Sequence, residues 1–127
     1  MIDIERFIEL ACEISFWHEQ TFPDATEDSQ ILKLSEEITE WRESKQNANS
    51  WDEQYKEIAD VLIVAAVLEF RYDNVMGKYI FNDIIEGLYM NDSMTVLNAV
   101  KNKMEINRRR KWIKLSDGRY KHIEGEK

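Results

Sequence analysis

The sequence is poor in the residues that interrupt helices. Among its 127 residues there are only one proline and four glycines. Strand-rich sandwiches and barrels need many turns, and those turns draw on proline and glycine. The shortage therefore argues against such folds and favours long helices.

Cysteine and long apolar runs are also scarce. The single cysteine, Cys12, cannot form an internal disulfide, so nothing indicates an oxidising compartment. Its apolar neighbours predict a small, buried side chain. The longest apolar run, 61–68, is far too short to span a bilayer, and the acidic N-terminus does not resemble a signal peptide. We therefore expect a cytoplasmic protein without membrane contact.

Positive charge is in deficit, since the formal net charge is −8. Such a chain lacks the positive field that nonspecific nucleic-acid binding needs, so we expect no nucleic-acid partner. It would also repel a free nucleotide, unless metal ions and a local basic patch reverse the sign. With 43% hydrophobic residues, residues 1–127 can form a single globular domain.

The periodicity of the apolar residues predicts an all-α, antiparallel bundle of four to five helices. We expect these helices over about residues 3–20, 27–46, 51–72, 79–90 and 94–111, followed by a tail, 113–127, that forms a small hairpin or crosses the surface.

Local signals mark the ends of these helices. Ser50 and Glu53 form a capping-box pattern that predicts the start of the third helix. Asn74 and Gly77 indicate a break over 71–78. A second stop is expected at Asn91–Asp92, with Ser93 capping the last long helix.

The third predicted helix is apolar on every side from Val61 to Leu68, which indicates burial all round. A small monomer has difficulty surrounding one helix completely. We therefore expect part of this helix to pack against another subunit, in a homodimer or a homotetramer.

Two pairs of carboxylates stand out on consecutive helices. Glu37 and Glu40 are three residues apart, as are Glu57 and Asp60. Residues at this spacing share one helical face. If the two helices run antiparallel, both acidic faces point into one cleft, where the carboxylates repel one another unless cations lie between them.

The ligand types favour magnesium, with manganese as a possible substitute, because all are hard oxygens without Cys or His at ligand spacing. A site of this kind usually handles phosphates. Single acids on helices usually face solvent, so the prediction depends on the combination. A di-iron carboxylate bundle would need Glu-x-x-His motifs, and neither His18 nor His122 follows a Glu at that spacing.

A basic stretch near the C-terminus could complement the acids. Lys103, Asn107 and Arg110 recur at helical spacing. Lysine supplies a point charge and arginine a planar fork for phosphate oxygens, while Asn107 could hold a sugar hydroxyl or a phosphate. Alternatively, the stretch is only a cationic helix C-terminus, which the helix dipole favours without a ligand.

Aromatic and polar residues gather before the first acidic pair, around Pro23. One interpretation makes Trp17 and Phe22 a packing corner and His18 a surface residue. The other makes them the wall of a base pocket, with Trp17, His18 and Gln20 as base contacts. Composition alone favours the first.

The ordered set of motifs resembles the MazG-like all-α nucleoside triphosphate pyrophosphohydrolases, in particular the small phage-type enzymes that act on dATP and dGTP. The similarity covers most of the chain, although residues 74–92 match no motif of that family. The matching residues are Trp17, Thr21, Phe22, Glu36, Glu37, Glu40, Glu57, Asp60, Lys103, Asn107, Arg110, Trp112, Gly118 and His122.

The resemblance implies hydrolysis between the α- and β-phosphates, which gives a nucleoside monophosphate and pyrophosphate. Magnesium ions would be held by Glu37, Glu40, Glu57 and Asp60. Glu36 would be an outer ligand or the base that orients water. Lys103 and Arg110 would hold the leaving pyrophosphate or stabilise charge in the transition state.

Two alternatives from other classes stay open. The chain could be a noncatalytic helical module that binds nucleotides or a partner protein. It could also be a plain helical scaffold whose acids face water. Product formation with magnesium separates the enzyme from the binding module, and a thermal shift with magnesium and nucleotide separates both from the scaffold.

Overall fold

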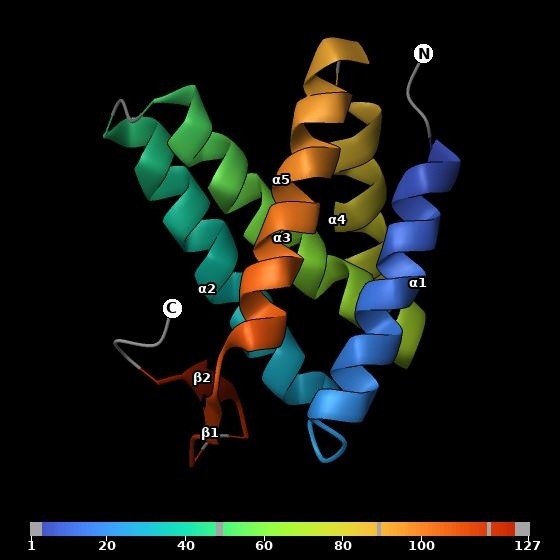
Figure 1. Ribbon diagram of the computed structural model, residues 1–127, viewed down its shortest axis with the longest axis vertical. Helices are drawn as coiled ribbons and strands as arrows, with labels where there is room; N and C mark the ends of the chain where they lie inside the picture. The colour runs from blue at the N-terminus through green and yellow to red at the C-terminus, as the bar shows by residue number, and fades with distance from the viewer. Residues whose placement is uncertain (1–3, 48–49, 89, 117, 124–127) are drawn as a thin grey trace.

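A computed structural model of the chain describes residues 4–47, 50–88, 90–116 and 118–123, with the side chains of 90–92 left aside. It confirms the all-α prediction (Figure 1). The elements are α1 (Ile4–Thr21), α2 (Glu27–Gln46), α3 (Trp51–Tyr72), α4 (Val75–Glu86), α5 (Met90–Arg109), β1 (Trp112–Lys114) and β2 (Tyr120–His122).

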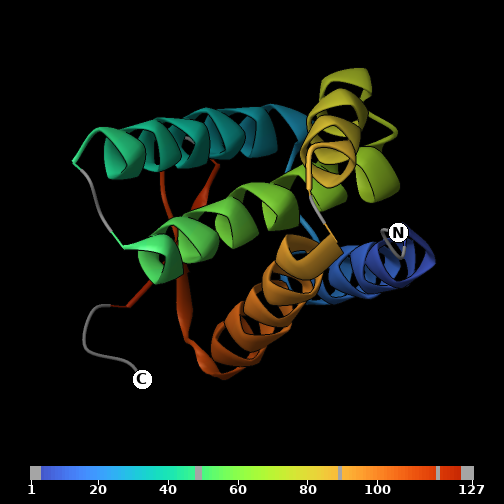
Figure 2. The ribbon, with the colours of Figure 1, turned by 90° about the horizontal axis from the view of Figure 1, so that it is seen from above.

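Helix α3 is the centre of the fold. It contacts each of the other helices, and Figure 2 shows it running between α2 on one side and α1 and α5 on the other. Its stretch from Val61 to Leu68 is buried within this one chain, with no residue more than 7% exposed. The argument that this helix needs a second subunit for its burial is therefore wrong, because the surrounding helices cover it.

Side-chain caps explain where α2 and α3 begin. The Thr26 hydroxyl accepts a hydrogen bond from the Ser29 N–H (3.1 Å), and the Ser29 hydroxyl lies 3.2 Å from the Thr26 N–H. At α3, the predicted cap is confirmed, since the Ser50 hydroxyl accepts from the Glu53 N–H at 3.3 Å. Because these caps satisfy N–H groups that have no partner within the helix, they fix both starting points.

The predicted break over 71–78 is wrong in extent, since α4 already begins at Val75. Asn74 is its N-cap and accepts from the Gly77 N–H at 2.9 Å. Gly77 lies inside the helix, where a Cβ atom would be 2.5 Å from the Cβ of Leu68. This glycine is therefore present for the close approach of α4 to α3, and not as a helix breaker. The same helix ends at Glu86, before the predicted residue 90.

The predicted stop at Asn91–Asp92 is also wrong, because α5 begins at Met90. Ser93 consequently lies within the first turn and is buried, so it does not cap the helix. Polar residues are common in a first helical turn as well as in loops, and the sequence pattern did not distinguish the two. The helix ends at Arg109, two residues earlier than expected.

Two further expectations concern the burial of Cys12 and the absence of a membrane-spanning helix. Cys12 is exposed, which contradicts the prediction that it is buried. It falls on the outer face of α1, while Ala11 and Ile14 beside it face the core. None of the described helices has both the length and the apolar character needed to cross a bilayer.

Of the two alternatives predicted for the tail, the structure shows the small hairpin. Strands β1 and β2 pair antiparallel, with Trp112 opposite His122. Gly118 has a φ of 90°, which only glycine adopts without strain. Asp117 before it lies outside the described residues. Lys114 (2.8 Å) and Tyr120 both contact the Asp24 carboxylate, so the hairpin is tied to the loop between α1 and α2.

Candidate functional site

One cavity of about 540 Å³ is lined by residues from most elements of the fold. Helices α1, α2, α3 and α5 and the hairpin each contribute to its lining. Its walls differ in character: one is acidic, one is basic and one is aromatic. Cations suit the acidic wall, anions such as phosphates suit the basic wall, and a flat aromatic ring suits the aromatic wall.

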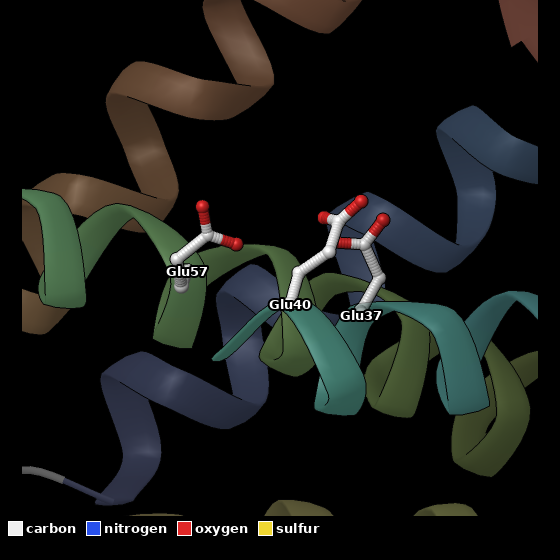
Figure 3. Close-up of side chains that lie close together, drawn as sticks. All are labelled: Glu37, Glu40 and Glu57. Carbon is white, nitrogen blue, oxygen red and sulfur yellow. The ribbon is translucent and has the colours of Figure 1, made fainter. Parts of the chain in front are cut away.

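The acidic wall contains a cluster of three carboxylates from two helices. Glu37, Glu40 and Glu57 each have a carboxylate oxygen within 4.8 Å of the others. Figure 3 shows them projecting from the same side of α2 and α3. The helical spacing of Glu37 and Glu40 places that pair on one face, and the packing of α2 against α3 adds Glu57.

The negative charges of this cluster are not fully balanced by positive charges or hydrogen bonds. Burial, followed by repulsion from Glu37, raises the pKa values of Glu40 and Glu57. One oxygen each of Glu37 and Glu57 is buried without a hydrogen-bond partner among the described residues. Buried carboxylate oxygens of this kind are expected where a hard cation binds. The cluster could therefore hold a divalent metal ion.

Asp60, the fourth predicted ligand, is not part of this cluster. Its carboxylate forms an ion pair with Lys103 at 3.3 Å and lines the cavity. Burial raises the pKa of Asp60 to about 7, although Lys103 acts in the opposite direction. The structure thus brings three of the four predicted ligands together and places the fourth between the acidic and basic walls.

Glu36 is half-exposed, lines the cavity and forms an ion pair with Arg119 of the hairpin. Sequence reasoning missed Arg119, because no local pattern links residue 119 to α2. It also missed Lys33, which lines the cavity and pairs with Glu37 at 3.1 Å. That pair has the (i, i+4) spacing of a helical ion pair, so the signal was present in the sequence.

The basic wall is formed by the face of α5 that the sequence predicted. Lys103, Asn107 and Arg110 all line the cavity, although Arg110 lies just beyond the end of the helix. The Arg110 guanidinium donates to Oδ1 of the buried Asn107 at 3.2 Å. This contact orients the planar fork of the arginine.

The aromatic wall combines α1 with the hairpin. Phe22 lies between Trp17 (ring centroids 5.4 Å apart), Trp112 (5.3 Å) and Tyr120 (4.4 Å). All four residues line the cavity. The two interpretations of these aromatic residues, a packing corner and the wall of a pocket, therefore describe the same group of rings.

The interpretation of His18 as a surface residue is wrong, because its side chain is buried and lines the cavity. Its Nδ1 lies 2.7 Å from a guanidinium nitrogen of Arg71. Gln20, by contrast, is exposed at the end of α1 and is not among the lining residues. The glutamine that does line the cavity is Gln30 of α2, which sequence reasoning missed.

No protein-family model matches the chain. Two curated phage proteins do, and both are described as dATP/dGTP diphosphohydrolases. The protein of Salmonella phage PMBT28 is 34% identical over 110 residues, which are 87% of this chain and 29% of that protein. The protein of Cyanophage S-2L is 31% identical over 117 residues, which are 92% of this chain and 88% of that protein.

The chain belongs to the family of phage dATP/dGTP diphosphohydrolases. Its members are nucleotide pyrophosphohydrolases, and this confirms the resemblance seen in the motifs. The chain spans less than a third of the length of the Salmonella phage relative and most of the length of the cyanophage relative.

A solved structure is also similar in sequence. It is the Cyanophage S-2L MazG-like pyrophosphohydrolase bound to dGDP and three catalytic Mn²⁺ ions per active site. It is 29% identical, each chain is covered to 94%, and the TM-score is 0.40. A score this low means that the two backbones superpose only in part.

The buried charge of Asp60 predicts a pH-dependent stability. Between about pH 4 and about pH 7 the folded protein keeps a proton on Asp60 that the unfolded chain has released, so the free energy of unfolding falls as the pH rises. In buffer without divalent cations, we expect Asp60→Asn to raise the Tm by a few degrees at about pH 8 and by less at about pH 5.

Calorimetry of the wild-type protein and of Asp60→Asn at the two pH values measures this difference. Asp83→Asn, which changes an exposed aspartate of α4, serves as the control and should show no pH-dependent gain. An equal change of the Tm for Asp60→Asn at both pH values would contradict the raised pKa.

Proposed function

We propose that this protein hydrolyses dATP and dGTP between the α- and β-phosphates and releases the nucleoside monophosphate and pyrophosphate. The observation that supports it best is the meeting of three carboxylates, a basic helix face and an aromatic wall in one cavity. The names of the two phage relatives support the choice of purine substrates.

In this proposal Glu37, Glu40 and Glu57 hold Mg²⁺, for which Mn²⁺ could substitute, and Asp60 completes or borders the site. A divalent cation, when bound, neutralises phosphate oxygens and lowers the pKa of a bound water. Glu36 lies in the cavity outside the carboxylate cluster. We assign to it the orientation of the water that attacks the α-phosphorus, with its carboxylate accepting the proton.

The basic wall is assigned to the departing pyrophosphate. The ion pair with Asp60 holds the Lys103 ammonium at the boundary between the acidic and basic walls. Arg110, oriented by Asn107, offers a planar fork to phosphate oxygens. Preorganised cations of this kind stabilise the negative charge that develops on the leaving group.

The aromatic wall is assigned to the base. Trp17 and its neighbouring rings supply faces for stacking, and His18 supplies a polar edge. Gln30 lines the cavity and Gln20 does not, which favours Gln30 over Gln20 as a base contact.

The alternative is a noncatalytic module of the same fold that binds nucleotides or a partner protein. A product assay separates the two functions. The protein is incubated with Mg²⁺ and each canonical dNTP, NTP and dUTP, and pyrophosphate, phosphate and monophosphate are quantified separately. We expect monophosphate and pyrophosphate from dATP and dGTP. Free phosphate with a diphosphate product would contradict the proposed bond, and saturable binding without product would favour the module.

The carboxylate cluster predicts a mutational result. We expect Glu40→Gln to reduce kcat/KM by more than about 100-fold while the circular-dichroism spectrum stays helical, because a cation ligand is lost without a change in side-chain size. Asp60→Asn should behave in the same way.

Glu43→Gln provides the matched control, since Glu43 is an exposed residue of α2 that does not line the cavity. It should retain activity. Full activity of both Glu40→Gln and Asp60→Asn would refute the assignment of the metal site.

We further propose that the protein is a homodimer or a homotetramer, as predicted from its sequence. The burial of α3 no longer supports it, but exposed apolar residues such as Tyr79 (68%) and Val75 (66%) on α4 are compatible with it. Light scattering at micromolar concentration should give a multiple of the chain mass of 15.2 kDa. The mass of a single chain would exclude an oligomer under these conditions.

A further inference from the structure

Arg71, in the last turn of α3, is bound to the end of α1. Its Nη1 lies 2.7 Å from Nδ1 of His18 and donates to the carbonyl of Phe22 at 3.0 Å, while Nη2 donates to the carbonyl of Pro23 at 3.1 Å. Carbonyls at a helix C-terminus carry partial negative charge, which favours a guanidinium there. Several contacts therefore hold the Arg71 guanidinium in place.

This contact decides the protonation of the imidazole. A guanidinium is always a donor, so Nδ1 of His18 must be the acceptor. A neutral imidazole carries one proton, which is then on Nε2. Burial, together with the charge of Arg71, lowers the pKa of His18 to about 3, so the ring is neutral near neutral pH.

The same ring lines the cavity at its aromatic wall. Its centroid lies 5.0 Å from that of Phe22 and 6.4 Å from that of Trp17. Among the described residues Nε2 has no hydrogen-bond partner, so its N–H is the polar group that His18 can offer to a ligand. A fixed donor beside ring faces suits a hydrogen-bond acceptor on a stacked base.

We propose that Arg71 is a positioning residue that fixes His18 as a donor to a ring nitrogen of the bound purine. The inference rests on the proposed function. Adenine and guanine share two unprotonated ring nitrogens outside the pairing edge, N7 and N3, so one fixed donor serves both bases. A site built around a donor discriminates against a ligand that lacks the acceptor, because the donor then stays unpaired.

Deaza nucleotides test this donor. With the wild-type protein, kcat/KM is measured for dATP, 7-deaza-dATP and 3-deaza-dATP, in which a C–H replaces one ring nitrogen. We expect one analogue to be poorer than dATP by about 10-fold or more, and its identity names the acceptor. Equal values for all three nucleotides would overturn the proposal.

The role of Arg71 is tested by repeating the comparison with Arg71→Met. Without the guanidinium, His18 is no longer held as a donor, so the preference for dATP over the poorer analogue should fall toward one. Arg42→Met, which removes an exposed arginine of α2 outside the cavity, should keep the preference. A uniform loss of activity with an unchanged preference would show a merely structural role and overturn the proposal.

A measurement without nucleotide keeps the inference separable from the proposed function and independent of how well Arg71→Met folds. The chain has only two histidines, so ¹⁵N spectra of the wild-type imidazoles are simple, and a His122→Gln variant assigns them. We expect His18 to carry its proton on Nε2 at about pH 7. A proton on Nδ1, or on both nitrogens, would overturn the proposal even if the enzyme is active.

If His18 shows the expected tautomer but the protein hydrolyses no nucleotide, the proposed function is wrong and the inference about His18 is not. Dissociation constants for the same three nucleotides would then test the donor.

Discussion

The contact between α2 and α3 is the interaction on which the site depends. It holds carboxylates from two helices close together although they repel one another and partly lack partners. Such an arrangement is unfavourable by itself, and it persists because α3 is enclosed by apolar contacts along its next two turns. Residues 57 and 60 directly precede that enclosed stretch. The apolar packing of this stretch thus offsets the repulsion among the carboxylates that precede it.

The cavity also explains how a chain with a net charge of −8 can receive a polyanion. Lys103 and Arg110 of the basic wall line the same cavity as Glu37 and Glu40, and Lys33 pairs with Glu37. Cations bound by the cluster would complete the change of sign. Positive side chains can thus gather at one place although the chain as a whole is acidic.

Long-range contacts hold the loop between α1 and α2 in place. Arg71 ties the start of this loop to α3, and Tyr72 donates to the Ala25 carbonyl at 2.7 Å. Asp24 of the same loop receives Lys114 and Tyr120 of the hairpin. The loop that carries Phe22 is consequently held from both sides, which preorganises the wall against which a base would stack.

The sequence by itself determined the class of the fold and the bounds of α2 and α3. It also determined that Glu37 shares a helical face with Glu40 and Lys103 with Asn107, because these features follow from helical periodicity and local caps. Only the tertiary structure decided that Glu57 joins the cluster while Asp60 pairs with Lys103, that His18 is buried against Arg71, and that Arg119 reaches Glu36. Gly77 shows the same limit, since it resembled a helix breaker until its contact with Leu68 was known. The physical reason is one of range: periodicity places residues on a face of their own helix, whereas the partner of that face is set by how the helices pack.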